Sequence, residues 1–164
     1  MTDRNLFIRK CRSMLQFRVY VVKEGNVEKD IILLPEGQGG IRLKNIYFDT
    51  VDDILIACLS GEIDHHNAGS LRSEIDAAIR AFNSKHLVLD YSQVDFMDSS
   101  GIGLAMGRYR NIRKNNGIMV IVPGSEYISR IFGLSGIFGT IPKSKNQMMA
   151  VGFITEKGGR SGDI

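Results

Sequence analysis

The chain has 164 residues, of which 43% are hydrophobic and 24% are charged, a balance that excludes global disorder and predicts one domain with a buried core. Its net charge of +3 belongs to the N-terminal end, because residues 1–22 hold five Arg or Lys residues against one Asp, a balance of +4, and the rest of the chain carries −1. We therefore expect a cytoplasmic protein: the nearly neutral body argues against direct DNA binding, two cysteines are too few for a disulfide scaffold, and no apolar run approaches the roughly 18 residues that span a membrane.

Residues 1–45 differ in character from the rest of the chain. They contain short apolar runs without a sustained period and lead into the glycine-rich segment "PEGQGG" at Pro35 to Gly40. We predict a weakly structured N-terminal extension that reaches a linker near residue 40. Two alternatives stay open, namely a pair of extra strands and a start codon assigned too far upstream.

A regular pattern begins at Ile46. The runs "IYF" and "DILIACLS" predict two strands on either side of a polar turn. The segment "GEIDHHNAGSLRSEIDAAIRAF" then predicts a helix, with Asn67 as a plausible N-cap. Its apolar side chains fall on one face at helical spacing: Leu71, Ile75, Ala78, Ile79 and Phe82.

The second half of the chain alternates between apolar strands and one-sided helices. "HLVLD" predicts a strand covered on both faces, and the helix after it carries one apolar stripe and ends at Asn116–Gly117. "IMVIV" predicts another buried strand, stopped by Pro123. A helix opened by Ser125, a short strand near residues 137–142 and a last helix around residues 147–154 complete the series.

The element order β-β-α-β-α-β-α-β-α indicates an α/β fold with a small mixed sheet. We expect about four helices, packed mainly on one side of that sheet. The predicted domain spans residues 46–155, between the extension at residues 1–45 and a frayed tail at residues 156–164.

The junction "MDSSG" between the buried strand and the next helix carries the most chemical information. It lacks the G-x-S-x-G pattern of a nucleophile elbow, and the chain has no P-loop and no metal-binding motif, so we expect neither a metal nor a cofactor. The simplest interpretation is helix capping, because Asp and Ser side chains satisfy the free N–H groups of a first turn. One cap suffices, however, and three candidates stand in a row: Asp98, Ser99 and Ser100. A helix N-terminus also tolerates a phosphate.

Three segments of the chain resemble the STAS-domain anti-sigma factor antagonists, especially those of the sporulation type. "FMDSSGIGLAMGRY" is similar to their phosphorylation loop, and "LSGEIDHHNAGSLR" to their G-E-(L/I)-D-H-H segment. "ISRIFGLSGIF" is similar to a third characteristic segment, a helix that ends in L/M-S-G-L/I-F. The three segments occur in the order of the family and cover about residues 46–155.

The resemblance implies a STAS-like fold and a non-enzymatic function. The unphosphorylated protein would bind a nucleotide-bound anti-sigma factor that is also a serine kinase, and so release the sigma factor. Phosphorylation would end the binding, and a PP2C-type phosphatase would reset the protein. By similarity the phosphoacceptor is Ser100, with Ser99 as a neighbouring minor site, and Asp64 near the acceptor.

The remaining site residues follow from the same resemblance. Asp98 would adjoin the docking surface, and Gly101 and Gly103 would keep it low enough for the active site of another protein to approach. Two alternatives stay open: a STAS scaffold or stress-response antagonist of another pathway, and a small serine hydrolase that uses Ser100 with His65 or His66.

Overall fold

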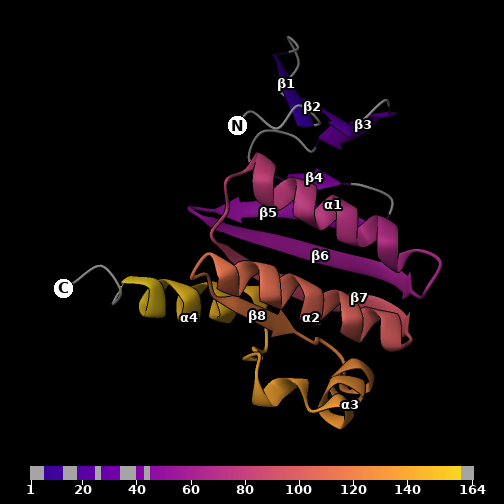
Figure 1. The fold of residues 1–164 in the computed structure, drawn as a ribbon, viewed down its shortest axis with the longest axis vertical. Coiled ribbons are helices and arrows are strands. Elements are labelled where there is room, and N and C mark those ends of the chain that lie inside the picture. Colours follow the sequence, from indigo (N-terminus) through magenta and orange to yellow (C-terminus); the bar gives the residue numbers. More distant parts are fainter. Residues whose placement is uncertain (1–5, 13–17, 25–26, 34–39, 43–44, 160–164) are drawn as a thin grey trace.

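The computed structural model describes residues 6–12, 18–24, 27–33, 40–42 and 45–159, and the surroundings of the side chains for residues 45–158. Eight strands form one sheet in the order of the chain: β1 (Leu6–Arg12), β2 (Arg18–Glu24), β3 (Val27–Leu33), β4 (Gly40–Arg42), β5 (Ile46–Val51), β6 (Ile54–Ile63), β7 (His86–Met97) and β8 (Met119–Val122). Neighbouring strands are antiparallel up to β6, whereas β6, β7 and β8 are parallel, so the sheet is mixed as predicted (Figure 1).

Strands β1 to β4 fall within the predicted N-terminal extension. The structure therefore favours extra strands, one of the alternatives that the sequence left open, and the described residues before Asn45 form four of them. They pair as successive antiparallel neighbours that continue the sheet beyond β5. The division of the chain at residue 45 stays a prediction.

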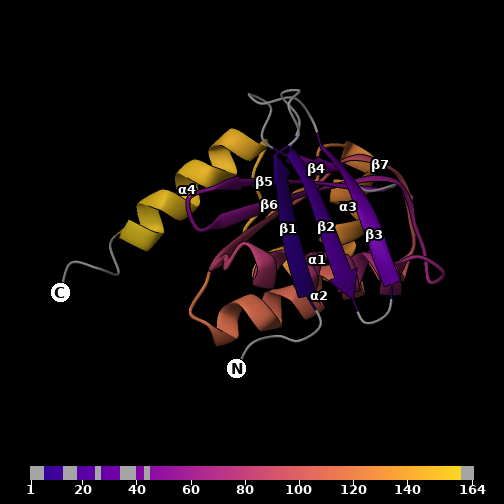
Figure 2. The same ribbon diagram turned by 90° about the horizontal axis from the view of Figure 1, so that it is seen from above.

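Four α-helices cover the sheet: α1 (Ala68–Ala81), α2 (Ser99–Lys114), α3 (Glu126–Ser135) and α4 (Gln147–Gly159). Helices α1, α2 and α3 bury their apolar stripes against one face, in a core that includes Ile75, Leu104 and Phe132. Helix α4 packs on the opposite face through Ala150 and Ile154 (Figure 2). The expectation of helices mainly on one side is confirmed, with α4 as the exception.

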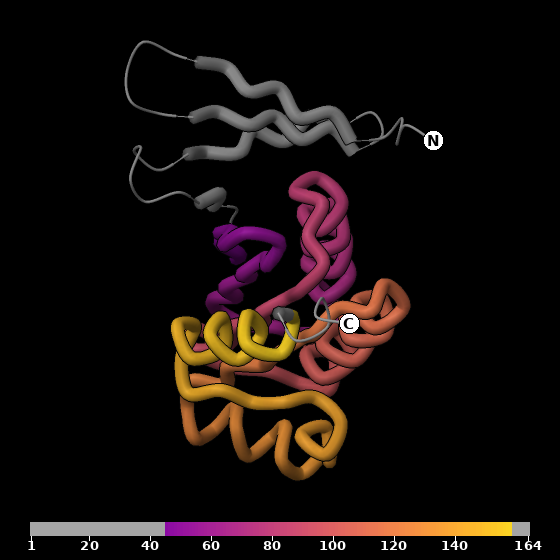
Figure 3. The backbone as a smooth tube through the Cα atoms, turned by 90° about the vertical axis from the view of Figure 1, so that its left-hand side faces the viewer, coloured from indigo at the N-terminus to yellow at the C-terminus, as the bar shows by residue number. Residues whose placement is uncertain are grey.

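Helices α1 and α2 lie side by side along β6 and β7 (Figures 1 and 3). Each of them begins directly after one of these parallel strands. Because the carboxyl ends of parallel strands lie at one edge of a sheet, both helix N-termini meet at that edge. This edge brings together the G-E-I-D segment, which follows β6, and the serine junction, which follows β7.

Residues 137–142 do not form the predicted strand. Ile137–Gly139 is a short 3-10 helix, and Ile141 donates its backbone N–H to the carbonyl of Ile137 at 2.9 Å. The preceding Gly136 has a φ of 77°, which turns the chain sharply after α3. The backbone of residues 137–141 is thus bonded locally, and the chain meets β8 only at an isolated parallel bridge between Lys143 and Ile121. In that bridge the Pro142 carbonyl accepts the Ile121 N–H at 3.0 Å, and the Ser144 N–H donates to the Ile121 carbonyl at 2.9 Å.

The C-terminal end also differs in length from the prediction. Helix α4 continues to Gly159, beyond the expected end near residue 154 and into the predicted tail. Residues 160–164 of that tail lie outside the described part of the chain. No helix in the described ranges is long and apolar enough to cross a membrane.

Candidate functional site

The serine junction forms the N-terminus of α2. Asp98 is the N-cap with an extended backbone, and its Oδ1 accepts the backbone N–H of Ser100 at 2.8 Å. Capping by Asp98 follows the usual preference for a short acceptor at this position. One of the three candidates therefore performs the capping, and the helix does not depend on the serine side chains for its cap.

Both serines lie at the surface in the first turn. Ser99 is exposed and Ser100 is half-buried, and the side chain of Asp98 is 34% exposed. The first turn contains no acidic residue of its own. An added anion here would meet the positive end of the helix dipole and the free N–H groups of the turn.

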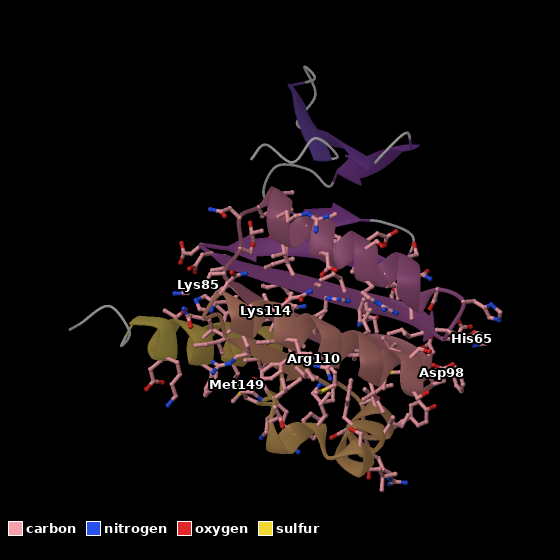
Figure 4. All side chains as sticks on the ribbon, in the orientation of Figure 1. His65, Lys85, Asp98, Arg110, Lys114 and Met149 are labelled. Atoms are coloured by element: carbon pink, nitrogen blue, oxygen red, sulfur yellow. The ribbon has the colours of Figure 1, made fainter. Side chains whose placement is uncertain are left out.

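Asp98 is the main charged group beside the serines. The Ser100 backbone N–H holds the pKa of the Asp98 carboxyl below its ordinary value, and the nearby His65 acts in the same direction. The His65 Nδ1 lies 3.8 Å from Asp98 Oδ2, and Figure 4 shows both residues at the same end of the molecule. The carboxylate form of Asp98 is thus stabilised by the contacts that shape the turn.

The G-E-I-D segment lies against the serine junction, as its predicted role requires. The carbonyl of Ile63 accepts the backbone N–H of Asp98 at 3.1 Å, so Asp64 and His65 follow directly from a residue bonded to the α2 cap. Asp64 Oδ1 in turn accepts the backbone N–H groups of His66 and Asn67, at 2.8 and 3.1 Å. The Asp64 side chain therefore shapes its own loop.

Asn67 occupies the predicted N-cap position of α1, but its side chain accepts no N–H from the helix. Its Oδ1 accepts the backbone N–H of Asp64 at 3.0 Å, and its Nδ2 donates to the carbonyl of Glu62 at 2.6 Å. The prediction of Asn67 as the N-cap residue is confirmed, although its side chain does not bond the first turn of the helix. Asn67 and Asp64 instead bond each other and fix the loop that adjoins Asp98.

The two glycines after the serines have different surroundings. Gly101 is buried, and a Cβ on it would overlap the side chain of Met97. Gly103 is exposed, and a Cβ on it would meet nothing within 4 Å. Packing alone explains the glycine at position 101, whereas nothing in the described packing requires one at position 103. The prediction that a missing side chain lets a partner approach closely therefore fits Gly103 better than Gly101, and it stays a prediction.

We expect Gly101→Ala to lower the free energy of unfolding by about 2 kcal/mol, because the added methyl must displace the buried Met97. Gly103→Ala is the matched control on the same helix. It should raise the stability by up to about 1 kcal/mol, since alanine favours the helix and the methyl has room. Urea unfolding of both variants measures the difference, and equal stabilities would contradict this account of Gly101.

The structure adds one exposed residue near the site and buries another that its sequence pattern places at the surface. Phe96, two residues before Asp98, is an aromatic side chain at the end of β7 that is 47% exposed. Its position just before the buried Met97 was a signal, since neighbouring strand residues face opposite ways. The basic cluster Arg108, Arg110, Arg113 and Lys114 has the pattern of a solvated helix face, but Arg108 is buried.

Arg108 is instead an interhelical residue. Its Nε lies 2.8 Å from Asp76 Oδ1 of α1, and its side chain is only 5% exposed. Burial lowers the pKa of the guanidinium, and Asp76 opposes that shift. The signal was the helical period, because Arg108 lies four residues after the buried Leu104 and four before the buried Ile112. Arg110, which Figure 4 labels on the same helix, lies off this stripe and is exposed.

The geometry does not favour nucleophilic catalysis by the serines. In the described part of the chain, His65 pairs with Asp98, and no histidine is hydrogen-bonded to Ser99 or Ser100. A nucleophilic serine needs a base within hydrogen-bonding reach. No three His, Cys, Asp or Glu side chains of the described residues gather as a metal site requires.

Comparisons with known proteins agree on one family. The model of the STAS domain matches residues 45–148. An anti-sigma F factor antagonist of Paenibacillus polymyxa is 37% identical over 98 residues, which are 60% of this chain and 84% of the relative. An anti-sigma-B factor antagonist of Staphylococcus epidermidis is 29% identical over 93 residues, or 57% of this chain and 85% of the relative.

Solved structures give the same fold. The anti-sigma factor antagonist SpoIIAA in its unphosphorylated form is 25% identical, with a TM-score of 0.56, and the match covers 65% of this chain and 92% of that one. An anti-sigma factor antagonist from Mycobacterium paratuberculosis is also 25% identical, with a TM-score of 0.57 over 66% of this chain and 92% of that one. The STAS domain match over residues 45–148 includes the whole serine junction and the loop that adjoins it.

Proposed function

Because the chain belongs to the STAS domain family, we propose that it is an anti-sigma factor antagonist whose unphosphorylated form binds an anti-sigma factor with serine kinase activity. Binding releases the sigma factor, and the protein itself catalyses no reaction. The kinase transfers a phosphoryl group from ATP to Ser100, the complex dissociates, and a PP2C-type phosphatase removes the group. This cycle takes place in the cytoplasm, without contact of this protein with DNA.

One observation carries the proposal above the others. Asp98 caps α2 through the backbone N–H of Ser100, so the cap does not require the hydroxyl groups of Ser99 and Ser100. Ser99 is exposed, and the half-buried Ser100 bonds Asp98 through its hydroxyl, at a positively polarised helix end. Asp64 and His65 adjoin this point from the neighbouring loop. Such a surface suits a partner that brings its own catalytic groups and needs only an accessible serine.

Incubation with the anti-sigma kinase and ATP, followed by mass mapping of the phosphate, tests the proposal. We expect one phosphate on Ser100, loss of that phosphate in Ser100→Ala, and its retention in the matched control Ser99→Ala. Both variants should stay folded, since neither removes the cap at Asp98. An unmodified wild-type protein beside an active kinase would contradict the proposal.

A second candidate is an antagonist of a stress-response pathway. The similarity to anti-sigma-B factor antagonists of Staphylococcus epidermidis, at 29% identity, supports it, while the higher identity to an anti-sigma F factor antagonist favours the first candidate. The two differ in the anti-sigma factor that is bound. Capture of the host's anti-sigma factors on immobilised protein, with identification of the sigma factor released, distinguishes them.

A further inference from the structure

A tyrosine lies beneath the turn that carries Ser100. Tyr91 of β7 is 0% exposed, and its hydroxyl donates to the backbone carbonyl of Gly101 at 3.1 Å. Gly101 is the residue after Ser100 and part of the first turn of α2. Strand β7 thus holds the first turn of α2 from the core, through a bond that does not belong to the helix.

The tyrosine ring is itself fixed by α3. Tyr91 meets Phe132 edge to face, with ring centroids 4.9 Å apart and planes at 81°, and Phe132 packs against Phe138 with centroids 5.8 Å apart. Edge-to-face contacts in a close-packed core leave a ring little freedom to tilt. The position of the hydroxyl is therefore set by residues of α3 and of the turn after it.

The hydroxyl is a dependable donor. Complete burial raises the pKa of Tyr91 far above its ordinary value, so the hydroxyl keeps its proton at any physiological pH. A buried hydroxyl without a partner would be costly, and the Gly101 carbonyl supplies that partner. Phenylalanine would fill the same volume without this bond.

Two side chains of the core, those of Met97 and Tyr91, hold the first turn of α2 at Gly101. Met97 packs directly under the Cα of Gly101, and the Tyr91 hydroxyl bonds its carbonyl. From above, Asp98 bonds the N–H of Ser100. The N–H of Ser100 and the carbonyl of Gly101 are therefore both held by side chains. Together these two bonds orient the backbone from which the Ser100 side chain projects.

We infer that Tyr91 is a positioning residue for the phosphoacceptor, which holds the first turn of α2 through the Gly101 carbonyl and couples that turn to α3. The inference rests on the proposed function only in naming Ser100 as the phosphoacceptor. The positioning itself is a property of the isolated protein. Tyr91 touches no partner, because it is completely buried.

Amide hydrogen exchange of Tyr91→Phe tests the positioning without a partner. The variant should exchange the amides of Ser100 and Gly101 roughly three- to tenfold faster, since it removes one hydrogen bond from that turn. Amides in the last turn of α2, near Arg113, should keep their rates. Tyr109→Phe is the matched control, because it deletes a hydroxyl from a half-buried tyrosine of α2 itself and should leave the exchange of Ser100 and Gly101 unchanged.

Unchanged exchange at Ser100 and Gly101 in Tyr91→Phe, or equal acceleration throughout α2 and β7, would overturn the inference. The second result would mean a general loss of stability in place of local positioning. With the kinase and ATP, Tyr91→Phe should also lower the rate of Ser100 phosphorylation roughly three- to tenfold. If the wild-type protein is not phosphorylated at all, the proposed function fails, while the exchange result still decides the role of Tyr91.

Discussion

Replacing Ser100 by aspartate is expected to weaken binding of the anti-sigma factor about thirtyfold. The aspartate places one negative charge where the proposed partner brings a nucleotide, and a loss of about 2 kcal/mol corresponds to that factor. A phosphate adds roughly −1.5 to −2 charges and should act more strongly, by several-hundred-fold for a loss of about 3–4 kcal/mol. Isothermal titration of the anti-sigma factor with each form of the protein measures these factors.

The loss in Ser100→Asp is predicted to come from the partner and not from the fold. Ser100 lies in the first turn of α2, where a carboxylate interacts favourably with the helix dipole, although the neighbouring Asp98 opposes it. The stability of the variant should thus stay within about 0.5 kcal/mol of the wild type. Ser100→Asn, which has the same shape without the charge, is the matched control and should bind within about threefold of the wild type. Undiminished binding by Ser100→Asp would contradict the proposed switch.

The sequence predicts the order of the sheet and helices around the site well, because strong local signals coincide there with burial. Apolar continuity identifies β7 and β8, which are covered on both faces, by α1 to α3 on one side and by α4 on the other. Ser125 caps α3 through the N–H of Ile128 at 3.2 Å, as predicted for the start of that helix. The same agreement of cap and period locates the start of α2 near Asp98.

Features that depend on a partner distant in sequence could not be predicted in this way. The Tyr91 hydroxyl bonds a carbonyl ten residues away, and its ring depends on Phe132 of another helix. Asn67 is a residue type that commonly caps helices, yet its side chain bonds the backbone of Glu62 and Asp64 and not the first turn of α1. Residues 137–142 are apolar enough for a strand, but the turn at Gly136 directs residues 137–141 into local hydrogen bonds.

Removal of the Asp76 carboxylate is expected to cause the largest loss of stability, about 3 kcal/mol. Asp76→Ala leaves the guanidinium of Arg108 buried without its counter-charge, and an uncompensated buried charge is far more costly than an exposed one. Arg108→Met removes the charge and keeps an apolar side chain of similar length, so it should cost less than about 1.5 kcal/mol. Thermal and urea unfolding of the two variants measure this asymmetry.

The asymmetry is the decisive feature, because simple loss of an attraction would lower the stability equally in the two single variants. The double variant Asp76→Ala with Arg108→Met should regain most of the stability that Asp76→Ala loses, since no buried charge then remains. The exposed pair Glu126 and Arg130, with side chains 89% and 72% exposed, is the matched control, and Glu126→Ala should cost less than about 0.5 kcal/mol. The pair of Asp76 and Arg108 joins α1 to α2, and both helices begin at the edge where the loop of Asp64 adjoins the N-terminus of α2. Loss of this pair should therefore also weaken binding of the anti-sigma factor. Equal costs for Asp76→Ala and Arg108→Met would contradict a buried guanidinium that depends on Asp76.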